Sequence, residues 1–264
     1  MQRFKTLLLL FVVIAMANGC SLHGEKLAWR VKDVVLTQTA VVRLSSADEQ
    51  VVFTLPTKTL QQMMLAHLRI ARTAKIQTEL FIVEGDEPNA VAGLQAGQKI
   101  IGINLGMVRM IGDDVNEYAA LIGHEAAHWA KGHIDSAQLR SSTLNALGTL
   151  VGGGLGMAGV PAAGMLTGLG VELIDSSFSR DQEREADAQS IDYLLANGYE
   201  LRAALRLQEK MLKAGGGFRL PFLSSHPSGE ERIQNVKALI EMKEAESRGA
   251  VSHSDKTERT VPPQ

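Results

Sequence analysis

Residues 124–128 carry the pattern that governs this chain, His124-Glu125-Ala126-Ala127-His128. On an α-helix, residues four positions apart share a face, so the two imidazoles can bind a single metal ion. Zinc suits them, because it accepts neutral imidazole nitrogens at roughly 2.0–2.1 Å in tetrahedral geometry. Glu125 directly follows the first histidine, where its carboxylate can take a proton from water activated by the metal. The pentapeptide therefore predicts a helical zinc site with a general base of its own.

The residues around the pentapeptide predict the helix that carries it. Asp114 and Glu117 are spaced as in a capping box, and Gly132 is a typical C-terminal stop, so we expect a helix over residues 115–131. Chance alone would produce the pattern HExxH in roughly one chain of this length in a hundred. The competing interpretation is a surface helix that has two histidines and a glutamate but binds no metal. A metal site is favoured here by the apolar neighbours Leu121, Ile122, Ala126, Ala127 and Trp129.

Two histidines leave zinc short of a third protein ligand, and the sequence limits where that ligand can come from. The metzincin pattern would need glycine three residues and histidine six residues after His128. Lys131 and Ile134 stand at those positions, which excludes that class. The alternative is a glutamate on a later helix, as in the gluzincins.

A later acidic helix offers candidates for the missing ligand. Ser179 and Gln182 form a second capping box that opens this helix. Glu183 and Asp187 are four residues apart and share a face, so one can bind zinc while the other accepts the N–H of a ligand histidine. Glu185 projects about 160–200° away from Glu183 and is the competing ligand. The alternative is a solvated acidic turn with ordinary ion pairs.

Several motifs together resemble metallopeptidase family 48 over roughly residues 55–245. They are HEAAH followed by Gly132-His133, then Phe178-Ser179-Arg180-x-x-Glu183-x-x-Ala186-Asp187, then Ser225-His226-Pro227 with Glu231-Arg232. The resemblance implies an α+β, predominantly helical fold, namely a zincin-like (gluzincin) domain with a small β-sheet and an active-site helix.

The same resemblance assigns roles to individual residues. It implies one zinc ion with three protein ligands, His124, His128 and Glu183. It also implies that Glu125 is the catalytic base and that Asp187 orients a ligand histidine. His226 is implied to approach the zinc, where it stabilises the oxyanion or occupies the fourth position. Taken alone, a loop histidine before proline is more often structural.

Periodicity and turn residues predict the remaining elements. Strands are expected at residues 51–53, 80–83 and 99–103. Further helices are expected at residues 60–74, from residue 180 to near 198, and up to about residue 246 after a capping box of Ser228 and Glu231. Residues 89–92 and the strand at 99–103 are expected to hold extended substrate by main-chain hydrogen bonds. A polar tail at residues 249–264 is expected to be disordered.

The N-terminus has the pattern of a secretory signal peptide. Two basic residues precede an apolar run at residues 7–17, which is short for a membrane span. Cys20, the only cysteine in the chain, follows this run and resembles a bacterial lipobox cysteine, although the residues before it depart from the common box. Ser21 is typical of outer-membrane lipoproteins. We expect a signal peptide at residues 1–19 and lipidation of Cys20, with an unlipidated signal peptide or an uncleaved anchor as the alternatives.

Domain boundaries follow from these elements. We expect a lipidated lead-in segment at residues 20–58, a zinc metallopeptidase domain at residues 59–248, and the tail. Inside that domain, residues 141–171 contain nine glycines and no charged residue. One membrane crossing there would put His128 and Glu183 on opposite sides of the membrane, where they could not share a metal ion. Two crossings would need about 20 residues each, which is more than this segment contains. We therefore expect a flexible, apolar hairpin near the active cleft.

Charge and targeting narrow the function. A formal net charge of −2 gives no electrostatic case for nucleic-acid binding. The leading prediction is a zinc-dependent endopeptidase for unfolded or misassembled cell-envelope proteins, lipid-anchored to the outer membrane and facing the periplasm. Its expected partners are these substrates, the membrane, and either further copies of the chain or an assembly machinery. The alternatives are a zinc-bearing chaperone whose cleavage is latent, with His226 blocking the metal, and a lipoprotein scaffold without zinc.

Overall fold

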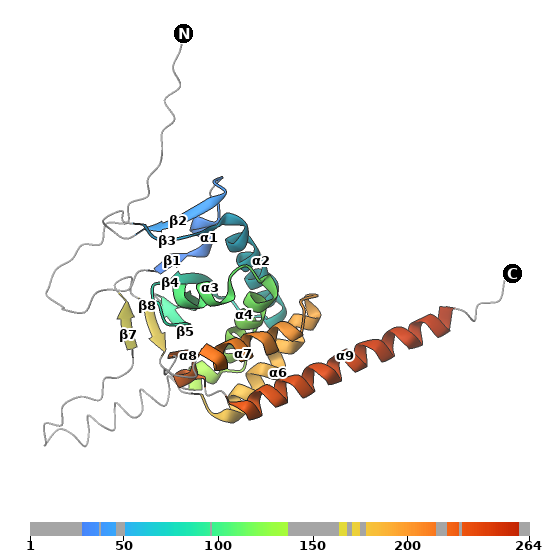
Figure 1. Ribbon diagram of the computed structural model, residues 1–264. Helices are drawn as coiled ribbons and strands as arrows, with labels where there is room; N and C mark the ends of the chain where they lie inside the picture. Colours follow the sequence, from blue (N-terminus) through green and yellow to red (C-terminus); the bar gives the residue numbers. More distant parts are fainter. Residues whose placement is uncertain are drawn as a thin grey trace, which may run out of the picture.

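Helices predominate in this protein and accompany a small mixed sheet (Figure 1). The computed structural model describes residues 28–36, 38–45, 51–95, 97–136, 164–167, 171–174, 178–214, 221–226 and 229–258. Within these segments the sheet and the longer helices share one large hydrophobic core. The predicted α+β, mainly helical, zincin-like class is confirmed.

The main sheet has the strand order β1-β4-β6-β5-β8-β7. β4 and β6 run parallel, and all other neighbours are antiparallel. The predicted strands at residues 80–83 and 99–103 are β4 and β6, whose apolar runs are buried as the centre of a covered sheet requires. The strands are β1 (Ala28–Arg30), β4 (Glu79–Val83), β5 (Ala90–Gln95), β6 (Gln98–Asn104), β7 (Gly164–Thr167) and β8 (Val171–Ile174), with a separate hairpin of β2 (Val41–Ser45) and β3 (Val51–Pro56).

The helices gather around α4, which packs against α2, α6, α7 and the sheet (Figure 1). The helices predicted at residues 60–74, 115–131 and 180–198 are confirmed as α2, α4 and α6. The described helices are α1 (Val31–Val34), α2 (Thr57–Ala74), α3 (Leu105–Ile111), α4 (Val115–Ala130), α6 (Arg180–Ala196), α7 (Arg202–Ala214), α8 (Pro221–Ser225) and α9 (Glu230–Glu258).

The central position of α4 explains its composition. Every residue from 117 to 129 is buried, so each polar side chain there needs a partner inside the protein. Asp114 caps the helix by accepting hydrogen bonds from the amides of Asn116 and Glu117. The carboxylate of Glu117 accepts from Lys210 of α7 at 2.7 Å instead of completing the predicted capping box. This ion pair stabilises the packing of α7 against α4.

α6 approaches α4 so closely that the contact requires glycine. A Cβ atom on Gly123 would lie 2.7 Å from Ser190 Oγ. The Ser190 hydroxyl donates to the carbonyl of Ala120 at 3.0 Å, which bonds the two helices directly. The predicted capping box of Ser179 and Gln182 is present in both halves and fixes the first residue of α6.

The C-terminal helix differs from expectation. α9 continues to Glu258, beyond its expected end near residue 246, so residues 249–258 are helical where a disordered tail was expected. This stretch contains one glycine and no proline, and a helix that is already nucleated propagates at little cost. The capping box of Ser228 lies outside the described residues.

The apolar segment and the N-terminus are described only in part. β7 and β8 pair antiparallel and extend the sheet beside β5, whereas residues 141–163 lie outside the described residues. The predicted signal peptide and Cys20 also lie outside them. Among the described helices, none combines the length and apolar character needed to cross a membrane.

Candidate metal centre

Four side chains from three parts of the chain converge on one point. His124 and His128 come from α4, Glu183 from the first turn of α6, and His226 from the segment between α8 and α9. One ligand atom of each lies within 4.8 Å of the others, and all four residues are buried. The Nε2 atoms of His124 and His128 are 3.1 Å apart, because their spacing puts both rings on one helix face.

Glu183 and His226 complete the cluster. Glu183 Oε1 lies 3.3 Å from His128 Nε2 and 3.0 Å from His226 Nδ1, and Glu183 Oε2 lies 3.4 Å from His124 Nε2. The ring of His226 stacks on Phe222 at a centroid distance of 4.4 Å, which fixes its plane. Imidazole nitrogens and a carboxylate are ligands that zinc prefers, so this set fits a tetrahedral zinc ion.

The hydrogen bonding of the site also fits a metal ion. Among the described residues, both carboxylate oxygens of Glu125 are buried without a hydrogen-bond partner. Burying carboxylate oxygens in this way is costly unless an ion or ordered water satisfies them. Glu125 Oε1 lies 3.6 Å from His226 Nε2, so this carboxylate faces the cluster without belonging to the predicted ligand set.

Asp187, one turn after Glu183, orients His124 from behind. Its Oδ1 lies 3.1 Å from His124 Nδ1, so that Nε2 of the ring faces the cluster. Arg232 of α9 donates to both oxygens of Asp187 at 2.7 Å, and Gln208 donates to Oδ1 at 3.2 Å. Arg232 also contacts Oε2 of Glu183. One buried guanidinium therefore joins two carboxylates of the site.

His128 is held by a different set of contacts. Its Nδ1 lies 3.1 Å from Nδ1 of the buried His133, and Nε2 of His133 lies 3.2 Å from Glu185 Oε2. Glu185 also pairs with Lys131 at 3.1 Å. The Phe178 ring lies against His128, with centroids 3.7 Å apart. Glu185, the competing candidate ligand, thus contacts His133 and Lys131 and is not part of the cluster.

Burial and charge shift the pKa values of the site in opposite directions. Burial by itself would lower the pKa of His124, but the charge of Glu183 and the hydrogen bond with Asp187 raise it to about 9. Burial lowers the pKa of His128 to about 2. Burial would raise the pKa of Glu183, yet His124 and the other histidines hold it well below its ordinary range. Arg232 likewise overcomes burial and lowers the pKa of Asp187 to about 2. The carboxylates are therefore ionised, as metal binding requires.

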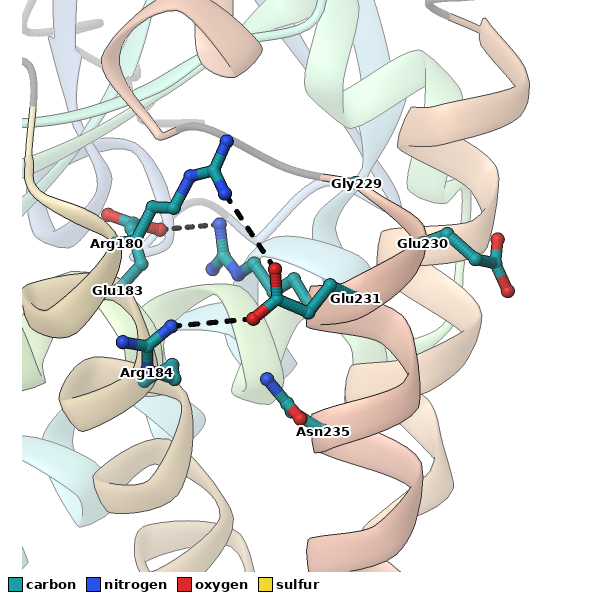
Figure 2. Close-up of a pocket in the computed structure, with 8 residues that line it drawn as sticks. Arg180, Glu183, Arg184, Gly229, Glu230, Glu231 and Asn235 are labelled. Carbon is teal, nitrogen blue, oxygen red and sulfur yellow. Dashed lines mark ion pairs between the residues drawn. The ribbon is translucent and has the colours of Figure 1, made fainter.

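An open cavity of about 210 Å³ adjoins Glu183 between the first turns of α6 and α9 (Figure 2). Glu231 pairs with Arg180 at 3.7 Å and with Arg184 at 3.6 Å on one side of it. All three side chains are exposed, so these ion pairs contribute little stability and can exchange partners. Among the residues that line the cavity, Glu183 belongs to the metal centre.

Comparison with known proteins agrees with this geometry. Residues 54–240 match the profile of Peptidase family M48. The chain belongs to peptidase family M48. The predicted resemblance to metallopeptidase family 48 is confirmed, and with it the expectation of a zinc-type donor set.

Similar M48 proteins include bacterial proteases. The chain is 32% identical to Metalloprotease LoiP of Escherichia coli (strain K12) over 137 residues, which is 52% of this chain and 54% of that protein. It is 31% identical to the beta-barrel assembly-enhancing protease of the same organism over 176 residues, 63% of this chain and 35% of that protein. Protease HtpX of Stenotrophomonas maltophilia (strain K279a) is 30% identical over 226 residues, 71% of this chain and 76% of that protein. The chain thus spans about half, or less, of the two Escherichia coli relatives.

Apart from the competing candidate Glu185, the site residues that the sequence predicted and the structure describes lie together. The residues brought together are His124, Glu125, His128, Glu183, Asp187 and His226. Arg232 and His133 had been noted only as parts of the resembling motifs, with no role. Gln208 carried no signal, because a glutamine within an amphipathic helix has no distinctive spacing.

Proposed function

We propose that this M48 protein is a zinc-dependent endopeptidase whose zinc has three protein ligands, His124, His128 and Glu183. The observation that carries the proposal is the convergence of these donors beside Glu125, a buried carboxylate without a hydrogen-bond partner among the described residues. The three metal-binding side chains by themselves would also be compatible with a structural zinc site. A buried and unpartnered carboxylate beside them is what a hydrolytic site needs as general base.

The proposed mechanism assigns each residue a separate step. A bound zinc ion would polarise the scissile carbonyl and lower the pKa of a water molecule. Glu125 accepts the proton of the attacking water and passes it to the leaving amine. His226, with Nε2 3.6 Å from Glu125 Oε1, donates a hydrogen bond to the developing oxyanion. Asp187 holds His124 in the orientation that presents Nε2 to the cluster.

The proposed substrates are unfolded or misassembled cell-envelope proteins. Residues 90–95 of β5 pair with β6 on one side, whereas β8 pairs only with residues 93–95 on the other. Residues 90–92 therefore have an outer edge without a strand partner in the described sheet, and an extended peptide can add there through main-chain hydrogen bonds. Such binding reads little sequence and suits unfolded chains. The name of the beta-barrel assembly-enhancing protease supports a substrate class in the envelope.

The proposed location is the periplasmic face of the outer membrane. It rests on the sequence pattern of a signal peptide at residues 1–19, followed by Cys20. The peptidase domain is proposed to be residues 59–248, with residues 20–58 as its lead-in. Labelling cells with radioactive palmitate should mark the wild-type chain and leave Cys20→Ser unlabelled. Equal labelling of the two, or none in either, would reject the lipid anchor.

His226 favours a second candidate function, a zinc-bearing chaperone or assembly factor with latent cleavage. Its Nδ1 lies 3.2 Å from His124 Nε2 and 3.0 Å from Glu183 Oε1, which is inside the cluster. From there it can take the fourth position on zinc and keep a substrate carbonyl out. This candidate requires a partner, such as an assembly machinery, that displaces His226.

Casein cleavage by the purified mature chain separates the two functions. The wild type should cleave, and Glu125→Gln should lower kcat by about 10²–10⁴-fold while keeping one zinc per chain, because an amide accepts no proton. Asp192→Asn, a change of a half-exposed carboxylate on α6, is the matched control and should cleave normally. Equal cleavage by wild type and Glu125→Gln would reject the mechanism. A wild type that is inert but restores outer-membrane protein assembly in cells would favour the second candidate.

A further inference from the structure

A chain of polar contacts runs from the surface to the back of His128. Lys131 Nζ lies 3.1 Å from Glu185 Oε1, and Glu185 Oε2 lies 3.2 Å from His133 Nε2. His133 Nδ1 then lies 3.1 Å from His128 Nδ1. The side chain of Glu185 is 50% exposed, His133 is 5% exposed and His128 is fully buried. The contacts therefore connect solvent with the metal centre through one imidazole.

The direction of each hydrogen bond follows once Nε2 of His128 holds a metal ion. A neutral imidazole carries one N–H, so Nδ1 of His128 must be the donor. Nδ1 of His133 must then accept, which leaves its own N–H on Nε2. That N–H faces Glu185, whose carboxylate can only accept. A single arrangement of protons thus satisfies every contact, and it is the arrangement that a zinc-bound His128 needs.

We infer that His133 and Glu185 are positioning residues for the zinc site, which select the Nδ1–H tautomer of His128 and hold its Nε2 towards the metal. The inference rests on the zinc ligation proposed for His128 and is independent of peptidase activity. Outer partners of this kind orient metal-bound histidines in many proteins. Here the partner is a second imidazole, backed by a carboxylate at the surface.

An electrostatic argument explains why His133, rather than a carboxylate, contacts His128. His124 has its carboxylate in direct contact, since Asp187 lies 3.1 Å from its Nδ1. A second carboxylate placed directly behind His128 would add another buried negative charge close to Asp187 and Glu183, which is unfavourable. His133 instead transmits the hydrogen bond while the charge of Glu185 stays at the surface beside Lys131.

Space filling is the competing explanation for His133, because its ring also lies near Phe178, with centroids 6.4 Å apart. Two substitutions separate shape from hydrogen bonding. His133→Phe keeps a planar ring and removes both hydrogen bonds. His133→Asn keeps an amide oxygen that can accept from His128 Nδ1 but is too short to reach Glu185.

Zinc dissociation constants of the full mature chain, measured by competition with a chelator, test the inference. His133→Phe should weaken zinc binding by about 10–100-fold, and His133→Asn should restore much of the loss. Glu185→Gln should weaken binding in the wild-type background and have no further effect beside His133→Asn, because the link is already cut. Asp192→Asn on the same helix is the control and should bind zinc as the wild type does.

Several outcomes would overturn the inference. One is a wild-type dissociation constant for His133→Phe, with only the Tm of the metal-free protein lowered, as space filling predicts. Another is an equal effect of Glu185→Gln in both backgrounds, since independent residues have additive effects. If His133→Phe fails to fold, the Glu185→Gln comparison decides, because Glu185 is half exposed. A chain that cleaves nothing but shows the predicted coupling would reject the peptidase function and uphold the positioning role.

Discussion

Replacing Gly123 with alanine should damage the metal centre without altering a ligand. The new Cβ would lie 2.7 Å from Ser190 Oγ, whereas ordinary contact begins at 3.4 Å. Either α6 moves away from α4 by several tenths of an ångström, or Ser190 rotates and loses its hydrogen bond to Ala120. Because α4 carries His124 and α6 carries Glu183, a shift between the helices changes the distances within the cluster.

Opposing contributions set the size of the effect. Overpacking a tight contact costs about 1–3 kcal/mol. Alanine in place of glycine inside a helix stabilises the helix by about 1 kcal/mol. We therefore expect the free energy of unfolding to fall by only about 1 kcal/mol. Cleavage should suffer more, with kcat/KM falling roughly 10–100-fold, because misplacing catalytic groups by about 1 Å can cost a factor of 10².

The assay compares Gly123→Ala, Ser190→Ala and the double variant in urea unfolding and casein cleavage. Ser190→Ala removes Oγ, and the next atom, Ser190 Cβ, would then lie 3.5 Å from the new methyl group, an ordinary contact. Ser190→Ala alone should cost about 0.5–1.5 kcal/mol, the loss of one hydrogen bond. The double variant should recover cleavage relative to Gly123→Ala. Wild-type cleavage by Gly123→Ala, or a double variant as impaired as Gly123→Ala, would refute the reasoning.

Further predictions concern other buried positions. Gly106→Ala should lower the free energy of unfolding by at least about 2 kcal/mol, because its Cβ would lie 2.2 Å from the carbonyl oxygen of Asp86; a urea midpoint equal to wild type would contradict this. Burial lowers the pKa of His67 from 6.5 to about 4, so the unfolded chain takes up this proton first as the pH falls. Stability of about 2 kcal/mol should be lost between pH 7 and about 5, and urea titrations of His67→Gln should lack this loss. Asp187→Ala leaves Arg232 buried without its two hydrogen bonds to that carboxylate and should cost about 3–5 kcal/mol in the same assay.

The spacing of residues within single helices was enough to predict the central residues of the site. His124 and His128 share a face on any α-helix, and the Ser179–Gln182 capping box identifies the first turn of α6. The choice between Glu183 and Glu185 could not be made from that local pattern, because both lie on the same short stretch of helix. The docking of α6 against α4 makes the choice, since it places Glu183 in the cluster and leaves Glu185 half exposed.

Contacts between distant segments could not be predicted in this way. The carboxylate of Glu117 pairs with Lys210, 93 residues later, rather than closing the capping box with Asp114. A helix cap contributes about 1 kcal/mol, whereas a buried carboxylate left without its partner costs several kcal/mol, so the tertiary ion pair prevails. The pairing of β8 with β5 is likewise a contact across a long segment that no local pattern specifies.

Three carboxylates on one stretch of α6 have different tasks because their surroundings differ. Glu183 lies among imidazoles, Asp187 lies between His124 and Arg232, and Glu185 stays at the surface. Glu183 and Asp187 are like charges buried one turn apart, and Arg232 contacts both, so its positive charge allows both to remain ionised before a metal binds. Arg232 comes from α9. The metal centre therefore depends on the docking of the C-terminal helix as well as on the histidines of α4, and its affinity for zinc is a property of three packed helices.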